Sequence, residues 1–298
     1  MEAIMHNPLL ALVLFFMLSV FIPAVAHPLA GEQGLATYLE FLTWKGSQES
    51  GKTLLEIYGL LDTRYFVVGK IVDQYAVNYG IELKVFDSGG NEVNSFHNTD
   101  LYEFPSYEGI NQRGLRRFHA SVELEPGLYL VHIAARDLNS LASLTTEAEV
   151  DVPAYLGEYL NLSSLQLHTG DRNGGPTIDG IVAGNVVKLE AEVYNTDFEL
   201  SRANRPLSVT VELSSITGRT VFRHQREIQK AGPTTRLSVQ FPASPLRNSR
   251  YWLQITVLDL DSGQSVSGST HFDLKSTKPE IVSNLRSVGA HTRSSAVK

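Results

Sequence analysis

The sequence lacks cysteine altogether, which excludes a disulfide framework, cysteine-ligated zinc, iron–sulfur clusters and thiol catalysis. It also lacks an excess of positive charge, because 25 lysines and arginines stand against 32 aspartates and glutamates and the net charge is −7. No overall basic field attracts nucleic acid, so we expect no nucleic-acid partner. Hydrophobic residues still make up 43% of the 298 residues, which excludes disordered, collagen-like and coiled-coil chains.

Long hydrophobic runs are also scarce, and the one that is present lies near the N-terminus. Residues 9–23 are almost entirely apolar, and an Ala-Val-Ala sequence of the kind that signal peptidase reads ends at Ala26. The run is short for a segment that must span a hydrocarbon core of about 30 Å. We therefore predict a signal peptide over residues 1–26, whose cleavage leaves His27 as the new N-terminus.

The usual positive charge before this run is missing, because residues 1–7 contain no lysine or arginine. An uncleaved N-terminal anchor is therefore the alternative to a cleaved signal peptide. We expect membrane contact only through the export signal, because no second run has the length of a spanning helix. An exported chain without cysteine favours a bacterial envelope, so we expect a secreted or periplasmic protein.

Alternation of apolar and polar residues with period two recurs along the rest of the chain, whereas helical periodicity is scarce. Within residues 115–124, for example, Phe118, Ala120 and Val122 point to one face and polar residues to the other. The Asp-Ser-Gly-Gly-Asn sequence at 87–91 favours a hairpin turn, because glycine adopts positive φ without steric cost. The pattern predicts strands at residues 35–44, 53–61, 65–69, 74–86, 115–124, 128–136, 143–152 and 207–213, with further strands beginning near 93 and 221.

The end of the first half of the sequence recurs in the second half at a shift of 122 residues. Tyr129 then falls on Tyr251, and Asp137, which opens an Asp-Leu-Asn-Ser turn, falls on Asp259, which opens an Asp-Leu-Asp-Ser turn. We interpret this as a tandem repeat in which one hairpin is used twice. The residues expected to face the two cores are Tyr129, Val131, Ile133 and Ala135, and Tyr251, Leu253, Ile255 and Val257.

These strands predict an all-β protein: two tandem antiparallel β-sandwich domains, immunoglobulin-like or fibronectin III-like, after the signal peptide. A tyrosine near the start of the penultimate strand is typical of the tyrosine corner in such folds. Apolar residues in the connection between the halves predict a packed linker. The expected bounds are 1–26 for the signal peptide, 27–152 for the first domain, 153–164 for the linker, 165–275 for the second domain and 276–298 for a disordered tail.

The first half also resembles a known family. A Leu-Glu-Ile-Tyr sequence ending at Tyr58 is followed by the 87–91 turn, a Pro-Gly-Leu-Tyr sequence ending at Tyr129 and the Asp-Leu-Asn-Ser turn ending at Ser140. This order is similar to the N-terminal β-sandwich region of bacterial GWxTD-domain proteins. The resemblance implies an exported bacterial sandwich protein of unestablished activity. The motif that names the family is absent, because neither Trp44 nor Trp252 follows a glycine.

Motifs of catalysis and of cofactor binding are missing from the sequence. His119 and His132 lie on strand patterns and could bind a metal if they met, but consecutive strands of a sandwich often belong to different sheets. Asp171, Asn173 and Asp179 have the spacing of calcium ligands, although Val182 occupies the position where a bidentate acid is needed. We expect no metal site, no cofactor and no enzyme activity.

An aromatic and acidic connection at residues 101–108 offers the first candidate binding site. Tyr102, Phe104 and Tyr107 could stack on sugar rings while neighbouring carboxylates bind the hydroxyls. The same side chains could instead close the open end of the sandwich.

Apolar residues on the expected outward faces offer the second candidate. Leu128 and Leu130 in the first half, and Trp252 and Leu258 in the second, lie opposite the predicted core residues. Burial against the sister domain, contact with a protein partner and ordinary exposure are all open.

The function predicted from these features is a non-catalytic exported protein that acts as an interaction or scaffold module in the bacterial cell envelope. The first alternative is a carbohydrate-binding module that uses the loop 101–108. The second alternative is a hydrolase whose site carries no recognisable motif. The expected partner is a protein or a glycan, and the candidate binding residues are Tyr102, Phe104, Tyr107 and Trp252.

Overall fold

The structure is a computed structural model of the whole chain. The residues described are 36–47, 51–71, 73–104, 106–107, 109–110, 114–169, 181–183, 186–243, 246–247 and 249–275. The predicted signal peptide at 1–26, the possible calcium loop at 171–179 and the predicted tail at 276–298 lie outside these ranges.

Strands form nearly all of the regular structure of the described residues, as the alternation predicts. Within this part of the chain, no helix has the length and apolar character needed to cross a membrane. The strands are β1 (Ala36–Lys45), β2 (Thr53–Asp62), β3 (Val68–Ile71), β4 (Gln74–Phe86), β5 (Glu92–Phe104), β6 (Leu115–Leu124), β7 (Gly127–Asp137), β8 (Ser143–Val152), β9 (Asn161–Leu162), β10 (Gln166–Thr169), β11 (Ile181–Ala183), β12 (Val186–Tyr194), β13 (Leu207–Ser215), β14 (Thr220–Ile228), β15 (Thr234–Pro242), β16 (Ser249–Asp259) and β17 (Ser265–Lys275).

One expected strand, at 65–69, is wrong. The 3₁₀ helix η1 (Thr63–Tyr65) occupies its beginning, and β3 starts only at Val68. The Asp62 side chain explains the difference, because its carboxylate accepts a hydrogen bond from the Arg64 backbone N–H at 3.0 Å and caps the helix.

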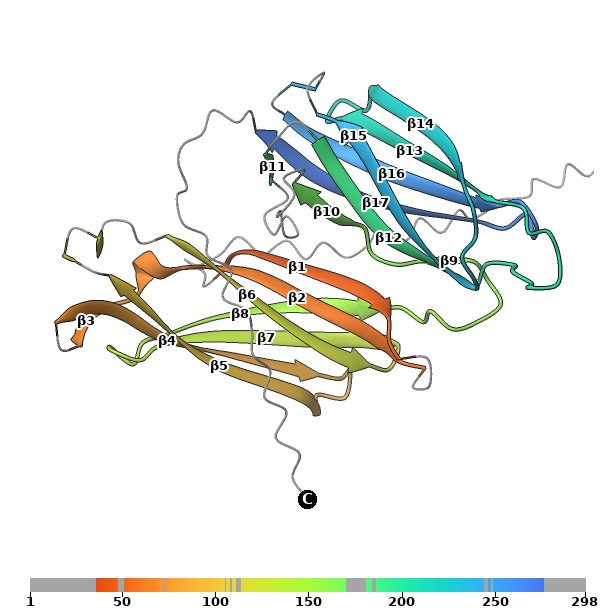
Figure 1. Cartoon of the computed structure of the whole chain (residues 1–298). Helices are drawn as coiled ribbons and strands as arrows, with labels where there is room; N and C mark the ends of the chain where they lie inside the picture. Colours follow the sequence, from red (N-terminus) through yellow and green to blue (C-terminus); the bar gives the residue numbers. More distant parts are fainter. Residues whose placement is uncertain are drawn as a thin grey trace, which may run out of the picture.

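The first half of the described chain forms two sheets that enclose one core (Figure 1). One sheet has the order β1-β2-β6; the other has the order β3-β4-β7-β8, with β5 paired to β4. Alternate residues of the strands supply the core. Its fully buried members include Leu55, Ile57, Val77, Val85, Val131, Ile133 and Ala135.

The second half also forms two sheets, around a separate core (Figure 1). One sheet has the order β10-β12-β15, with β9 paired to β12; the other has the order β11-β17-β16-β13-β14. Its fully buried members include Val187, Val193, Leu207, Leu213, Leu253, Ile255, Val257 and Phe272. All eight tyrosine and aliphatic residues predicted to face the cores from β7 and β16 are buried.

One strand pair departs from the purely antiparallel prediction. β11 runs parallel to β17, with Ile181 opposite Asp273 and Ala183 opposite Lys275. A parallel partner has to arrive from a distant part of the chain, because two parallel strands cannot be joined by a tight turn. The alternation of a three-residue strand carries no sign of this direction.

The two hairpins that correspond at a shift of 122 residues each contain a similar tyrosine hydrogen bond. The Tyr129 hydroxyl donates to the Glu125 carbonyl at 2.8 Å, and the Tyr251 hydroxyl donates to the Arg247 carbonyl at 2.9 Å. Both bonds have the geometry of a tyrosine corner, in which a tyrosine at the start of a strand fastens the backbone just upstream. The expected tyrosine corner is therefore present in both halves.

The connection between the halves is packed in part. Tyr155 and Leu160 are buried, whereas Leu156 and Tyr159 are exposed. The prediction of a packed linker therefore holds for Tyr155 and Leu160 and is wrong for Leu156 and Tyr159.

Hydrogen bonds join the two halves at this connection, and the one between Thr43 and Tyr155 is buried. We call this set of bonds the seam. The Thr43 hydroxyl lies 2.7 Å from the Tyr155 hydroxyl and 3.0 Å from the Ser164 hydroxyl. The Thr43 N–H donates to the Ser164 hydroxyl at 2.9 Å, and the Lys45 N–H donates to the Tyr194 hydroxyl at 2.9 Å. The seam is therefore directional and polar, and it fixes β1 to the second half.

Candidate functional site

Three of the four candidate binding residues lie around one end of the first half. Tyr102 and Phe104 belong to β5, which shows that the predicted loop at 101–108 is wrong for its first four residues. Phe104 is buried in the core, and its ring meets the Tyr102 ring edge-on at 4.5 Å. Phe104 therefore packs beside Tyr102 and does not itself reach the surface.

A cationic side chain packs against the Tyr102 ring. The Arg116 guanidinium lies 3.2 Å from the ring centroid, in the geometry of a cation–π contact. One face of Tyr102 is therefore occupied by Arg116, and a sugar could stack on this face only after displacing the guanidinium.

Tyr107 is the most accessible ring of this group, with 67% of its surface exposed. It meets the Tyr75 ring edge-on at a centroid distance of 5.6 Å. Tyr75 pairs with Phe104 across the strands, so Tyr107 and Phe104 belong to one aromatic cluster. The structure thus brings the three predicted residues together, although only Tyr107 is well exposed.

A buried tyrosine and a carboxylate on the same two strands add polar contacts. The Tyr79 hydroxyl donates to Asp100 Oδ2 at 2.8 Å. Burial raises the pKa of Tyr79, and the negative charge of Asp100 raises it further. Tyr79 is therefore a fixed hydrogen-bond donor, not a general base.

The fourth candidate, Trp252, lies in the other half of the molecule. Its indole is 49% exposed on β16, whose alternate residues Tyr251 and Leu253 are buried. The indole packs beside the His271 ring at 5.2 Å, and Ser214 lies opposite Trp252 on β13. Trp252 therefore forms no common site with the tyrosines.

The other apolar residues predicted to point outward behave less uniformly. Leu128 is 51% exposed, while Leu130 and Leu258 are half-buried. Of these residues, Leu128 and Trp252 present the largest fractions of their surfaces to solvent.

A polar cluster that the sequence analysis missed lies on the outer face of the β1-β2-β6 sheet. Glu56 Oε2 accepts a hydrogen bond from Trp44 Nε1 at 2.8 Å, and Glu56 Oε1 lies 3.4 Å from His119 Nε2. The Tyr58 ring stacks on His119 at 4.4 Å. The register explains the cluster, because Tyr58 is directly opposite His119 and two residues from Glu56.

The pKa of Glu56 indicates the charge state of this cluster. Burial alone would raise the pKa of Glu56, but hydrogen bonds from His119, Trp44 and Tyr58 outweigh burial and hold the pKa below its usual value. The carboxylate is therefore charged and surrounded by donors at neutral pH. The period-two pattern of the three strands places Trp44, Glu56 and His119 on outward faces. The sequence does not reveal that these strands are neighbours in one sheet, which is what brings the three side chains together.

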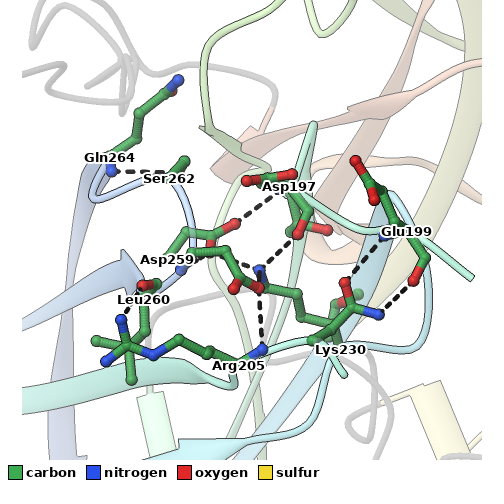
Figure 2. Close-up of polar contacts among 12 residues, drawn as sticks. Asp197, Glu199, Arg205, Lys230, Asp259, Leu260, Ser262 and Gln264 are labelled. Atoms are coloured by element: carbon green, nitrogen blue, oxygen red, sulfur yellow. Dashed lines mark hydrogen bonds and ion pairs between the residues drawn. The ribbon is translucent and has the colours of Figure 1, made fainter. Parts of the chain in front are cut away.

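A second missed cluster surrounds Lys230 in the second half (Figure 2). The Lys230 ammonium lies 2.5 Å from Asp259 Oδ1 and 2.7 Å from Asp261 Oδ2, and it donates to the Asp197 carbonyl at 2.7 Å. The side chains of Lys230 and Asp259 are completely buried. Three acceptors match the three N–H groups of the ammonium, so Lys230 has no hydrogen left for a ligand.

Asp259 is satisfied in the same way. Its carboxylate accepts backbone hydrogen bonds from Asp197 at 2.8 Å and from Asp261 at 2.9 Å. Burial would raise the pKa of Asp259, but the bond to Lys230 and the backbone donors lower it. The cluster therefore has a structural role: it holds the backbone at Asp197 and the side chain of Lys230 against the turn that follows β16.

Metal ligands do not gather in the part of the chain that the structure describes, where no group of three or more histidines and acids is close enough. His119 lies on β6 and His132 on β7, which belong to different sheets.

Comparisons with known proteins give little that bears on the site. A scan against protein-family models gives no match, and a search of curated proteins gives none. Solved structures give weak matches to β-glucuronidases. One is a β-glucuronidase of Bacteroides uniformis, with a TM-score of 0.28 and 11% identity, covering 80% of this chain and 32% of that enzyme.

Another is a β-glucuronidase of Parabacteroides merdae, with a TM-score of 0.27 and 14% identity, covering 74% of this chain and 28% of that enzyme. The chain thus spans about a third of the length of these enzymes. Similarity this weak defines neither a family nor an activity for the chain.

Proposed function

We propose that the chain is a non-catalytic exported β-sandwich protein that acts as an interaction or scaffold module in a bacterial cell envelope. In this proposal the two halves are tandem copies of one sandwich, and the chain is related to the sandwich region of GWxTD-domain proteins. The half-exposed indole of Trp252 carries the proposal, because it stands on a strand whose neighbouring side chains form a closed core.

The seam supports a scaffold role. Thr43, Tyr155 and Ser164 join the halves through buried and part-buried hydroxyl contacts, which are directional and costly to leave unpaired. A module held in this way presents its outer faces at a fixed spacing. Leu128 and Trp252 are among the exposed apolar residues that these outer faces offer to a partner.

The reactive groups described above also support a non-catalytic role. Lys230 uses its three donors on Asp259, Asp261 and the Asp197 carbonyl. Glu56 accepts from Trp44 and lies against His119. Each group has partners that stabilise the fold, which is the arrangement expected of structural and not of catalytic charges.

Photo-crosslinking tests the interaction. A benzoylphenylalanine probe is placed at Trp252 or Leu128 and, as a matched control, at Thr256 on the same face of β16 as Trp252. In cells of the organism that encodes the chain, we expect one reproducible crosslinked partner from Trp252 or Leu128 and none from Thr256. An absence of discrete products from both positions would contradict the proposal.

A carbohydrate-binding function is the second candidate, and the exposure of Tyr107 favours it. Tyr107 is 67% exposed, and Tyr75 holds it edge-on. An aromatic ring fixed in this way can stack on the apolar face of a sugar.

A glycan array with the exported chain tests this candidate. Binding should be lost in Tyr107→Ala and kept in Tyr65→Ala, because Tyr65 is 56% exposed but makes no aromatic contact in the cluster described above. Glycan binding that Tyr107→Ala leaves unchanged, or no binding at all, excludes this site.

A further inference from the structure

The two halves differ at one edge of their larger sheets (Figure 1). In the second half, β11 pairs with the last residues of β17, Asp273–Lys275, and covers the end of this edge. In the first half, the corresponding edge strand is β8, and no strand among the described residues pairs with its outer side. An uncovered strand presents unpaired N–H and carbonyl groups that can accept another strand.

The opposite edge does not show this difference. β5 pairs only with β4, and its counterpart β14 pairs only with β13, so among the described residues this edge is uncovered in both halves. β8 is therefore the edge of the larger sheet at which, among the described residues, the first half lacks a strand that the second half has.

The outward side chains of β8 are acidic. Glu147, Glu149 and Asp151 alternate along the strand and are exposed, and the strand contains no basic residue. At the shift of 122 residues, these positions become Ser269, His271 and Asp273 on β17, so only the last one is acidic. Two of the three negative charges therefore occur only at the uncovered edge, and the third is shared by both halves.

The neighbouring strand adds apolar surface to this row. Leu128 and Leu130 on β7 lie directly opposite Asp151 and Glu149, on the same outward face. Leu128 is 51% exposed. The outward side chains of an added strand would therefore lie next to the acids of β8, and the two leucines of β7 would lie on the far side of those acids.

The charges decide between occupants. A second copy that added its own β8 would place acids opposite acids, which destabilises a strand pair. A segment with lysine or arginine at alternate positions would place opposite charges side by side and complete the backbone hydrogen bonds.

We propose that the outer edge of β8 binds an extended, basic segment of a partner protein, which adds to the sheet as β11 does in the second half. This inference rests on the proposed interaction function and names the chemistry of the partner. Its apolar residues would face the margin of the core, and its basic residues would face Glu147, Glu149 and Asp151.

A synthetic peptide tests the edge directly. The probe is a fluorescent seven-residue peptide with blocked ends that alternates lysine with valine, and its binding to the exported chain is measured by anisotropy. We expect binding that weakens as salt is added, because exposed charges are screened. A peptide with glutamate in place of lysine should not bind. A peptide whose alternate backbone amides are N-methylated should also fail, because strand addition needs those N–H groups.

Variants of the chain locate the site. The triple variant Glu147→Gln, Glu149→Gln, Asp151→Asn should weaken binding about tenfold, since three charge pairs are lost. The matched control Glu92→Gln, Glu103→Gln removes acids from β5 at the opposite edge and should leave the affinity unchanged. Equal effects of both variants would overturn the proposal, because they would indicate nonspecific attraction.

Hydrogen exchange separates the remaining occupants. Amide protection should increase in β8 when the lysine peptide is added. Protection of the β8 edge before any peptide is added would overturn the proposal, and sedimentation velocity would then distinguish a second copy from another part of the same chain. A partner crosslinked at Trp252 together with no peptide binding would contradict the β8 proposal alone. Failure of both experiments would also contradict the interaction function.

Discussion

Leu141 and Gly263 occupy the same position in two corresponding turns, with φ angles of 63° and 74°. Each donates its backbone N–H to an aspartate carbonyl, at 2.8 Å for Leu141 to Asp137 and at 2.8 Å for Gly263 to Asp259. The conformation is left-handed in both, but only glycine adopts it without strain.

Leu141→Gly should therefore stabilise the protein. The leucine side chain is 63% exposed and contributes little packing, whereas its left-handed backbone costs about 1 kcal/mol. We expect urea unfolding to show a gain of about 0.5–1 kcal/mol.

The reverse change, Gly263→Ala, should lower the free energy of unfolding by a similar amount. A Cβ at Gly263 would meet nothing within 4 Å, so the loss would come from backbone strain alone. A destabilised Leu141→Gly would show that the leucine side chain does more than its exposure indicates.

Lys230→Met should be the most damaging of the changes considered. It leaves the Asp259 carboxylate buried without its cation, and an uncompensated buried charge costs about 3–5 kcal/mol. Arg250→Met is the control, because the Arg250–Asp273 pair is largely exposed and should contribute about 1 kcal/mol or less. Similar losses in urea unfolding for both variants would contradict the structural role of Lys230.

The two corner tyrosines should differ in their contribution to stability. Tyr129→Phe removes one hydrogen bond, to the Glu125 carbonyl, and should cost about 1 kcal/mol. The Tyr251 hydroxyl both donates to the Arg247 carbonyl and accepts from the Arg247 N–H at 3.0 Å, so Tyr251→Phe should cost about 2 kcal/mol. Equilibrium unfolding of the two variants measures the difference, and equal costs would count against it.

Acid should weaken the protein through Glu190. Burial would raise the pKa of Glu190, but hydrogen bonds from Lys188 and Arg236 and the charges of Arg236 and His168 lower the pKa to about 2. The folded pKa is thus below the unfolded value of about 4.3, so this stabilisation is complete above pH about 4.3 and is lost as the pH falls toward 2.

A Glu190→Gln variant tests this sign. Its deficit against the unmodified protein should approach at most about 3 kcal/mol at pH 7 and shrink as the pH falls toward 2. Glu212→Gln is the control, because Glu212 lies 3.9 Å from the largely exposed Arg223. A deficit for Glu190→Gln that does not change with pH would rule out the linkage.

Export predicts a defined new N-terminus. Mass spectrometry of the protein recovered from the cell envelope should find a chain that begins at His27, because the Ala-Val-Ala sequence ends at Ala26. A chain that retains Met1 and stays with the membrane fraction would favour the uncleaved anchor.

Strand positions could be predicted where one face of a strand is buried. β4, β6 and β8 begin and end where the alternation predicts, because burial of one face fixes the pattern. β5 runs to Phe104, farther than expected, because most of its side chains are exposed and leave no period-two signal. The resemblance to GWxTD-domain proteins stays a prediction.

The candidate site was less predictable than the strands. Tyr102, Phe104 and Tyr107 do lie together, but the burial of Phe104 depends on the path of β5 through the sheet. Lys230 shows the limit most clearly. A single lysine in a connection between strands does not indicate burial. Asp259 lies beside Lys230 only because of where β16 packs in the folded sheet.

The seam imposes an order on how the molecule is made. Thr43 lies in the first strand, whereas Ser164 follows it by 121 residues, so their contact closes a very long loop. Thr43 leaves the ribosome long before Ser164, and until Ser164 arrives water must take the place of its hydroxyl beside Thr43. Docking of the halves is thus a late event in synthesis, and a nascent chain stalled before Ser164 would carry an unfinished joint that is open to the wrong neighbour.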